Sequence, residues 1–272
     1  MSEKLVIDLG DIQKTLLLPL WGRAMETQKK KPLLLDTKAV EIIKMIEYDF
    51  STIAANISPT TRFGWIGRRL CTDKLIGKFL ERHPAGAVVD IGCGMDTNFE
   101  NVDNGTLKWY DLDMPDVIGL RRKFFSETDR RRFISGSMLD FQWMNRLSAE
   151  EHVFFIAAGV LYYFEESQVR QLIVQLAEHF PGSEFLFDVS SPLGVRVANK
   201  LVIRGSGLDE KSFLKWGIKD INDLKKWDSR LQSVKRHSFF KGIRSRMDFK
   251  TRLQSHLSDF LDIMYMVHVK FQ

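Results

Sequence analysis

The sequence is poor in the residues that build disulfide frameworks and metal centres. Only 2 cysteines, Cys71 and Cys93, and 6 histidines occur among its 272 residues. Two cysteines cannot form the disulfide framework of a small secreted domain, so a reducing cytoplasm is the expected compartment. The histidines are dispersed and do not take the spacing of metal ligands, so we expect no metal site.

Long apolar runs and several well-known catalytic motifs are also missing. The longest apolar run, Val153 to Phe164, is too short to cross a bilayer, and the N-terminal segment lacks the apolar stretch of a signal peptide. The chain has no Gly-x-x-x-x-Gly-Lys-Ser/Thr phosphate loop, no His-Glu-x-x-His pair and no Gly-x-Ser-x-Gly elbow. We therefore expect no membrane partner and none of the three chemistries that these motifs support.

A strong charge of one sign is absent as well. The formal net charge is +5 at pH 7, and the basic clusters Lys29–Lys31, Arg121–Lys123 and Arg130–Arg132 are short and scattered. A nucleic-acid binder concentrates its positive charge in one stripe, so we expect no nucleic-acid partner. The small positive surplus is explained equally well by an anionic small molecule, and the three clusters are typical of solvated faces.

What the chain does contain is a change of periodicity near residue 86. Before it, apolar residues recur at helical spacing, as over Leu75–Leu80, and Pro84 ends that helix. After it, short apolar runs of strand length begin. We therefore expect a helical N-terminal cap over residues 1–85 and a core over residues 86–272 that carries lid insertions.

The apolar runs of the core alternate with amphipathic helical segments. The predicted strands are Ala87–Ile91, Leu107–Tyr110, Arg132–Ile134, Val153–Ala157 and Glu184–Asp188. This alternation predicts an α/β fold with a parallel sheet covered by helices on both faces. The C-terminal part is less regular: Met264–Val269 is typical of a terminal strand, and a partner strand is expected near Val234–Phe240.

A glycine-rich turn follows the first predicted strand. Asp90 is followed by Ile91-Gly92-Cys93-Gly94, and glycines at such a turn let the backbone bend tightly and approach a ligand. An acidic residue just before the first glycine is unlike a dinucleotide fingerprint, and the third glycine of that fingerprint is absent; Asp96 stands two residues after Gly94. The motif favours a nucleoside-containing ligand other than a dinucleotide.

Two further acidic residues follow the next strands. Asp111 lies at the end of the second strand, where a carboxylate accepts hydrogen bonds from both ribose hydroxyls. Because it ends a strand, we expect it to lie outside the core. Asp140 follows the third strand, where it can accept the amino group of adenine. These three features together predict a nucleoside site but leave NAD open as the ligand.

These motifs resemble the leucine carboxyl methyltransferase family, and within it the bacterial branch of tetracenomycin-type polyketide O-methyltransferases. The resemblance covers nearly the whole chain. Its most specific parts are the Gly-x-Gly-x-Asp-Thr turn at residues 92–97 and the Asp-x-Pro-x-Val segment at residues 113–117. Further matching segments are Trp21–Ala24, Trp109–Ile118, Gly136–Asp140, Gly159–Tyr163, Phe187–Val189 and Lys215–Gly217.

The resemblance implies a Rossmann-like class I methyltransferase with a mostly parallel seven-stranded sheet and a helical N-terminal cap. It implies S-adenosylmethionine as the cofactor and a small-molecule acceptor, methylated on an oxygen in polyketide biosynthesis. Arg68 matches an arginine that contacts the carboxylate of the cofactor, with Arg69 as its rival by one position. The remaining residues implied in cofactor binding are Lys14, Asp90, Gly92, Gly94, Asp96, Asp111, Leu112, Met138, Leu139, Asp140, Ala157 and Ala158.

One position departs from the family pattern. The family commonly has glutamate before the glycine that follows the fourth strand, and Ala158 stands there in this chain. This departure keeps open a non-catalytic relative that binds the cofactor. A protein C-terminal carboxyl methyltransferase and an NAD-dependent oxidoreductase also stay open, although Asp90 and the missing third glycine disfavour the oxidoreductase.

The chemistry of methyl transfer favours a carboxylate acceptor. A carboxylate has a pKa near ~4 and is ionised at neutral pH without a general base, whereas a phenol, with a pKa near ~10, needs one. The absence of an obvious catalytic dyad is therefore compatible with activity on an acid or on a hydroxyl that is otherwise activated. Tyr163 matches a family tyrosine and is expected either to position the substrate or to pack beneath the lid.

Overall fold

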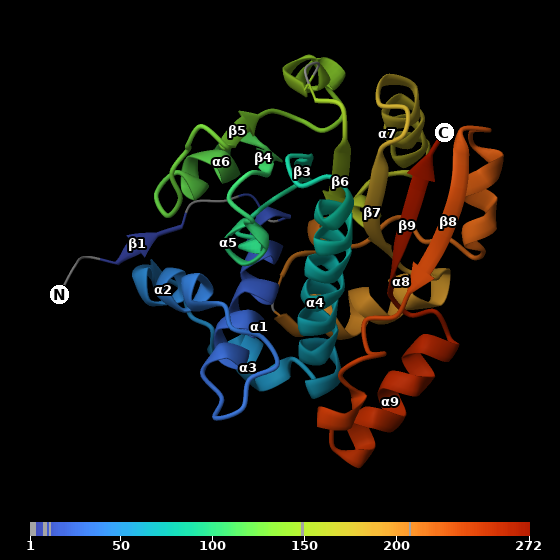
Figure 1. Cartoon of the computed structure of the whole chain (residues 1–272). Coiled ribbons are helices and arrows are strands. Elements are labelled where there is room, and N and C mark those ends of the chain that lie inside the picture. The colour runs from blue at the N-terminus through green and yellow to red at the C-terminus, as the bar shows by residue number, and fades with distance from the viewer. Residues whose placement is uncertain (1–3, 8–9, 11, 148–149, 207) are drawn as a thin grey trace.

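The computed structural model describes the chain except for residues 1–3, 8–9, 11, 148–149 and 207. Its centre is a seven-stranded sheet with the order β5-β4-β3-β6-β7-β9-β8 (Figure 1). The strands are β3 (Ala87–Ile91), β4 (Lys108–Asp113), β5 (Arg131–Ser135), β6 (Val153–Ala157), β7 (Glu184–Val189), β8 (Leu231–His237) and β9 (Tyr265–Phe271). β3 to β7 pair in parallel, whereas β9 runs antiparallel to both β7 and β8.

This arrangement confirms the predicted mostly parallel sheet of seven strands. The five predicted parallel strands coincide with β3 to β7, the largest difference being at the end of β4, which runs on to Asp113. The two C-terminal strands are also present, although β8 begins and ends three residues before the predicted Val234–Phe240. The α-helices of the core are α5 (Asn98–Val102), α6 (Pro115–Arg121), α7 (Glu166–His179), α8 (Pro192–Ala198) and α9 (Phe249–Phe260).

The two faces of the sheet are covered by different helices, which explains why the central strands are apolar throughout. Every residue of β3, β6 and β7 is buried. On one face Ile76 and Phe79 of α4 (Pro59–Arg82) pack against Val88 and Phe154, and on the other Leu172 of α7 packs in the cluster that includes Phe155. A parallel sheet buried on both faces requires such continuous apolar strands.

The N-terminal part is mainly helical. It contains α1 (Leu17–Thr27), α2 (Thr37–Met45), α3 (Ser51–Asn56) and α4, together with a short parallel pair, β1 (Leu5–Val6) and β2 (Ile46–Glu47). α1 packs against α2 and α4, while α4 itself lies on the sheet. α4 precedes residue 85 but packs on the sheet of the core, so the packing does not separate a cap from a core at that residue. The boundary at residue 85 stays a prediction.

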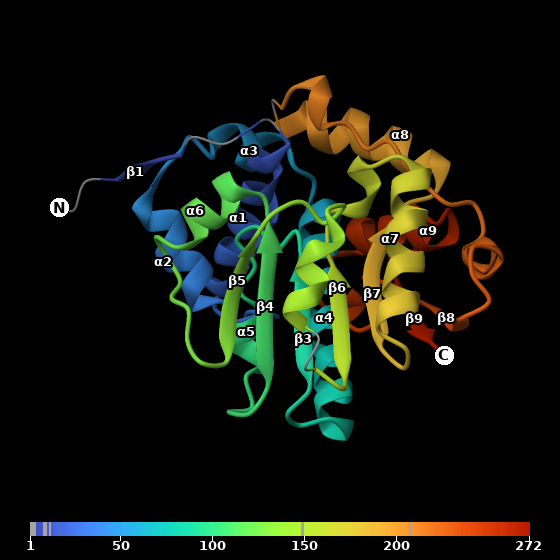
Figure 2. The same cartoon turned by 90° about the horizontal axis from the view of Figure 1, so that it is seen from above.

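Short 3₁₀ and π segments complete the chain. These segments are η1 (Gln13–Leu16), η2 (Phe141–Leu147), η3 (Leu161–Tyr163), the π-helical η4 (Asn199–Ile203), η5 (Arg204–Ser206), η6 (Glu210–Ser212), η7 (Ile221–Lys226) and η8 (Arg244–Arg246). Three of them, η1, η3 and η4, lie at the carboxyl ends of the parallel strands. Figure 2 shows β4 pointing toward the side of the molecule that carries α1, α3 and α8. Within the described ranges, no helix is long and apolar enough to span a membrane.

Candidate active site

A cavity of about 940 Å³ opens at the carboxyl ends of the parallel strands. This is where open α/β sheets bind their ligands. The turns after β3, β4 and β6 form one side of the cavity, whose walls include Gly92, Gly94, Asp96, Asp113, Met114, Ala158 and Gly159. Helices α1, α4, α8 and α9 and segments η1, η3 and η4 supply the other walls, so the N-terminal and C-terminal parts of the chain both contribute.

The glycine turn has the backbone that its sequence requires. Gly92 has φ +68° and Gly94 has φ +46°, a conformation in which other residues are strained. A Cβ atom on Gly92 would lie 2.5 Å from Cγ2 of Val160. The N–H of Gly94 donates to Oδ2 of Asp113 at 2.8 Å, which ties the turn to the end of β4. The turn therefore presents bare backbone to the cavity, as predicted.

The acidic residue of β4 that borders the cavity is Asp113 and not Asp111, so the expectation for Asp111 is corrected. Asp111 is fully buried and does not border the cavity. Its Oδ1 accepts from Arg121 Nη2 and its Oδ2 from Arg131 Nε, both at 2.8 Å, and Trp109 Nε1 also donates to Oδ1. Both oxygens accept hydrogen bonds from buried side chains. Asp111 lies within β4, which runs on to Asp113, so it is not at a strand end and is part of the core.

Asp113 has the position that was expected of Asp111. It is the last residue of β4 and extends one residue past the pairing of β4 with β3, which ends at Leu112. Besides Gly94, the N–H of Met114 donates to its Oδ1 at 2.7 Å. Burial raises the pKa of Asp113 to about 6. The signal that sequence reasoning passed over is the second acidic residue of the Asp-Leu-Asp run, two residues closer to the edge of the sheet.

Asp90 lies behind the glycine turn rather than on the cavity wall. Its side chain is almost completely buried, and its Oδ2 has no hydrogen-bond partner among the described residues. Burial, followed by the nearby charges of Asp96 and Asp111, raises the pKa of Asp90 well above its ordinary value. An unpartnered buried oxygen beside a bare glycine backbone is a feature that a bound polar ligand or its water would satisfy.

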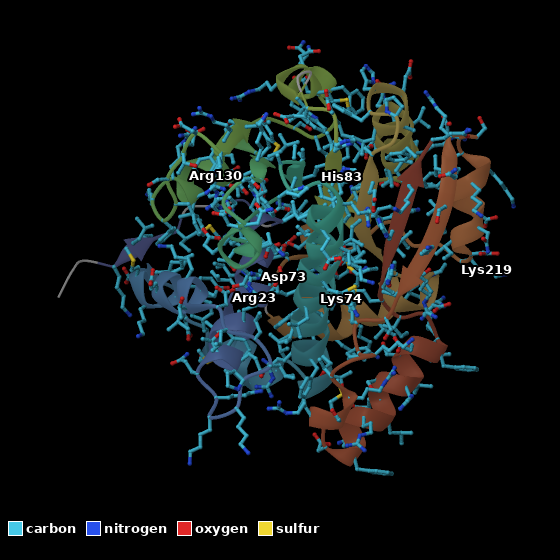
Figure 3. All side chains as sticks on the ribbon, viewed as in Figure 1. Arg23, Asp73, Lys74, His83, Arg130 and Lys219 are labelled. Carbon is cyan, nitrogen blue, oxygen red and sulfur yellow. The ribbon has the colours of Figure 1, made fainter. Side chains whose placement is uncertain are left out.

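The two neighbouring arginines of α4 point to different places. Arg68 borders the cavity, and its Nη1 donates to Oδ2 of Asp188 at 2.9 Å. Arg69 instead binds Asp73 through Nε at 2.9 Å and Thr97 Oγ1 through Nη1 at 2.6 Å. Figure 3 labels Asp73 in the region where α1, α4 and α5 converge, and Asp73 does not line the cavity. Of the two rivals, Arg68 is the one placed to meet a ligand.

A second arginine, Arg23, also borders the cavity; it belongs to the matching segment Trp21–Ala24, but no role in the site was predicted for it from the sequence. Arg23 of α1 pairs with Asp36 through Nε at 2.8 Å and with Asp96 through Nη1 at 2.9 Å, and its Nη2 donates to the carbonyl of Met95. Figure 3 labels Arg23 close to Asp73, in the region where α1, α4 and α5 meet. It fixes the segment that follows the glycine turn, so α1 and the turn are held together.

Ala158, the position that departs from the family pattern, borders the cavity and a small polar void. The void measures about 10 Å³, and Arg23, Arg68, Arg69 and Asp96 are among its lining residues. Next to it, Oδ1 of the fully buried Asp188 accepts from the N–H of Gly159 at 2.7 Å. Asp188 therefore supplies a carboxylate close to the position where the family has glutamate.

Besides Asp90 and Asp111, six of the expected cofactor residues do not border the cavity: Lys14, Leu112, Met138, Leu139, Asp140 and Ala157. Lys14 lies in η1, whose neighbouring residues Gln13 and Thr15 do line it. Leu112 and Ala157 are fully buried in their strands. Asp140 is exposed, and its Oδ1 accepts from the N–H of Gln142 at 3.4 Å. The cofactor roles of these six residues stay predictions.

The part of the cavity away from the strands is mostly apolar. Its walls include Leu18, Trp65, Leu201, Ile203, Leu214, Phe239, Phe240, Leu257 and Met264. Tyr163 also borders the cavity, its hydroxyl makes a hydrogen bond with Thr15, and burial raises its pKa to about 12. Most of these apolar residues come from the C-terminal third, and none of those belongs to a segment that was matched to the family from the sequence.

The single reversed strand β9 in an otherwise parallel seven-stranded sheet, and the glycine turn tied to Asp113, are the fold and site of a class I methyltransferase. A model of leucine carboxyl methyltransferase matches residues 17–177, more than half of the chain, and the protein belongs to that family. Its cofactor is S-adenosylmethionine.

Individual relatives agree with this assignment. The chain is 30% identical over 214 residues to the tetracenomycin polyketide synthesis O-methyltransferase TcmP of Streptomyces glaucescens, an alignment that covers 78% of this chain and 77% of the relative. It is 26% identical to the S-adenosyl-L-methionine-dependent methyltransferase dpfgK of Gibberella zeae, over 71% of each chain. A crystal structure from Thermobifida fusca, described as a putative methyltransferase, shares the fold with a TM-score of 0.57 at 13% identity, over 92% of this chain and 94% of that one.

S-adenosylhomocysteine is expected to raise the melting temperature of the purified protein. A ligand that binds only the native state stabilises it by mass action, and at about one hundred times Kd the gain of about 2.7 kcal/mol corresponds to roughly 5–10 °C. Differential scanning fluorimetry measures this shift. NAD at the same concentration serves as the control and should cause none; the opposite result would contradict the cofactor assignment.

Cofactor affinity should fall at acidic pH because of Asp113. Its pKa is raised from 3.8 to about 6, so the cofactor-free fold binds this proton more tightly than the unfolded chain does. The stability that the proton provides is complete below pH 3.8 and is lost as the pH rises through about 6. The Asp113 carboxylate, which is expected to accept hydrogen bonds from the ribose hydroxyls, forms over the same pH range.

Calorimetry with S-adenosylhomocysteine at pH 5 and pH 7.5 tests this expectation. At pH 5 about one tenth of Asp113 is ionised, so the affinity should be up to about tenfold lower. An Asp113→Asn variant, which cannot ionise, should bind weakly at both pH values. An equal pH dependence in the variant and the wild type would assign the titration to another group.

Proposed function

We propose that this methyltransferase acts on a carboxylate oxygen of an apolar small-molecule acid, of the polyketide type to which the Streptomyces relative's name refers. The observation that carries the proposal is the lack of a general base: among the described residues that line the cavity there is no histidine. Asp96 is paired with Arg23, and both oxygens of Asp113 accept backbone N–H groups. With Asp113 assigned to the ribose hydroxyls, the proposed acceptor is one that is ionised on its own, as carboxylic acids are.

S-adenosylmethionine supplies an electrophilic methyl group on a sulfonium sulfur. The residues of this chain that fit its binding are the turn Gly92–Gly94 for close backbone approach, Asp113 for the ribose hydroxyls and Arg68 for the carboxylate. The apolar walls exclude water and hold the acceptor, which raises the rate by alignment rather than by proton transfer. Lys215 lines the cavity with a half-exposed side chain, and its Nζ lies 3.7 Å from Oε1 of the exposed Glu165.

Transfer of a labelled methyl group to matched acceptors tests the proposal. An aromatic carboxylic acid should be methylated, whereas the phenol and the primary amide of the same ring system should not. The product should be a methyl ester, which releases methanol in mild alkali; an alkali-stable ether would contradict the proposal. A peptide ending in leucine is tested as a further acceptor. Preference for this peptide would make the protein a C-terminal carboxyl methyltransferase.

A Tyr163→Phe variant separates a positioning role from a basic one. Because its pKa of about 12 keeps the Tyr163 hydroxyl protonated near pH 7, the hydroxyl is expected to donate rather than accept a proton. The variant should therefore raise KM for the acid more than it lowers kcat. If wild-type protein bound S-adenosylhomocysteine but methylated none of the acceptors, that result would favour a cofactor-binding protein without catalytic activity.

A further inference from the structure

Helix α9 exposes its large apolar side chains and buries its small polar ones. Phe249, Leu253, Leu257 and Phe260 are 82%, 62%, 54% and 82% exposed. At 3.6 residues per turn these four positions fall within roughly 80° of one helix face. The residues that α9 buries are Thr251 and Ser255. This is the reverse of the pattern that an amphipathic surface helix shows in a globular protein.

Polar contacts hold α9 in this orientation. Asp248 caps the helix by accepting from the N–H of Thr251 at 3.0 Å, and Arg244 donates to Ser255 Oγ at 3.1 Å. Asp259, one turn further on, also binds Arg244 and accepts from Ser238. These bonds pair the polar groups on the inward face of α9, and a rotation of α9 that buried its apolar stripe would break them. The fold therefore holds the apolar stripe in its outward orientation.

Positive charge surrounds this apolar stripe. Lys241, Arg246, Lys250 and Arg252 are exposed, and Lys250 and Arg252 lie on either side of the stripe. Within residues 241–260, Asp248 is the one exposed carboxylate, and it is occupied as the helix cap. Arg246 also donates to the carbonyl of Lys31, which brings the exposed cluster Lys29–Lys31 to the same region.

The stripe continues into the mouth of the cavity. Leu257 belongs to the stripe and also lines the cavity. Leu201 of η4 lines the cavity as well and is 59% exposed. Figure 1 shows α9 at one end of the molecule, away from the sheet, where a flat surface can approach it. An apolar acceptor would thus meet exposed apolar side chains at the entrance.

We propose that α9 docks this enzyme on an anionic lipid surface and so places the cavity mouth against the bilayer. Phenylalanine and leucine on one helix face with lysine and arginine beside them is the composition of helices that lie in the membrane interface. The cytoplasmic leaflet carries anionic lipids that attract such cations. The expectation of no membrane partner rested on the lack of a spanning segment, which a surface contact does not need.

The charges disfavour a second copy of the chain as the occupant. A two-fold contact through α9 would place Lys250 and Arg252 against their own copies, and like charges would oppose the association. Lipid headgroups, in contrast, neutralise these cations, and acyl chains adapt to protruding side chains that no preformed protein pocket has to match. The contact is independent of which acceptor the cavity takes.

Vesicle co-sedimentation of the full chain tests the proposal. Wild-type protein should bind vesicles of phosphatidylcholine with about 30% phosphatidylserine and bind phosphatidylcholine alone at least about tenfold less. A Phe249→Ser/Leu253→Ser/Phe260→Ser variant should lose at least about tenfold in partitioning, and so should Lys241→Glu/Lys250→Glu. None of these residues borders the cavity, so S-adenosylhomocysteine binding should be unchanged in both variants.

The matched control replaces Val6, Leu35 and Met45 by serine; these side chains are 68%, 65% and 50% exposed and lie outside α9. The control should bind vesicles as the wild type does. Equal loss in the control, or no binding of the wild type to anionic vesicles at low salt, would overturn the proposal. So would a dimer seen by analytical ultracentrifugation that the serine variant of α9 abolishes. Vesicle binding is measured without methyl transfer. The membrane proposal is therefore tested separately from the proposed acceptor.

Discussion

An Asp111→Ala variant is expected to lose about 3–5 kcal/mol of folding free energy, because the change leaves buried arginines without their common carboxylate. The side chains of Arg121 and Arg131 are only 1% and 4% exposed, and each makes a 2.8 Å ion pair with Asp111. Arg131 keeps its second partner, Glu100, at 2.6 Å, whereas Arg121 has no other carboxylate within ion-pair distance among the described residues. Urea unfolding followed by tryptophan fluorescence measures the loss as a lower midpoint.

Asp113→Asn is the matched control for this variant. It removes a carboxylate two residues along the same strand but leaves both arginines paired, so stability should change by less than about 1 kcal/mol. Its effect should instead appear as weaker S-adenosylhomocysteine binding. A stable Asp111→Ala protein that has lost only cofactor affinity would restore the ribose-binding role first expected of Asp111.

An Arg68→Lys variant should bind S-adenosylhomocysteine roughly 10- to 150-fold more weakly, the equivalent of losing a charge-assisted hydrogen bond of about 1.5–3 kcal/mol. Lysine retains a positive charge beside the fully buried Asp188, so the fold should persist. It lacks the planar fork with which arginine binds a carboxylate and a second acceptor together. Isothermal titration calorimetry gives the affinity directly.

Arg69→Lys serves as the comparison, since it makes the same chemical change one position along α4. Arg69 binds Asp73 and Thr97 outside the cavity. Its loss should therefore lower the unfolding midpoint and leave the dissociation constant within about threefold of the wild type. If Arg69→Lys weakened binding and Arg68→Lys did not, the contact with the cofactor's carboxylate would belong to Arg69.

Much of the fold could be predicted because its signals are local. The buried strands β3, β6 and β7 are nearly continuous apolar runs, and the glycine turn needs φ values above zero at Gly92 and Gly94. The pair β1–β2 was not predicted, since two residues per strand carry no periodic signal. The order of the strands likewise follows from pairing across the chain and not from any one segment.

The candidate site was predicted in part. Sequence reasoning found the glycine turn, Arg68, Asp96 and Ala158, all of which border the cavity. It chose Asp111 over Asp113 because the predicted strand ended at Tyr110, whereas β4 runs on to Asp113. The local sequence does not show how deeply each carboxylate is buried. The arginines that bind Asp111 lie 10 and 20 residues away and reach it only through the folding of α6 and β5 against β4.

Local sequence signals were enough for the class of fold, because strand periodicity and a glycine turn act over a few neighbouring residues. The cofactor followed from the resemblance to the family, since the motifs alone left NAD open. Tertiary structure decided which carboxylate reaches the cavity and which face of α9 meets solvent. The spacing of Phe249, Leu253, Leu257 and Phe260 is that of a face that packs inward, yet Arg244 and its partners turn Ser255 inward instead. Burial depends on contacts between distant segments, and no local pattern specifies those.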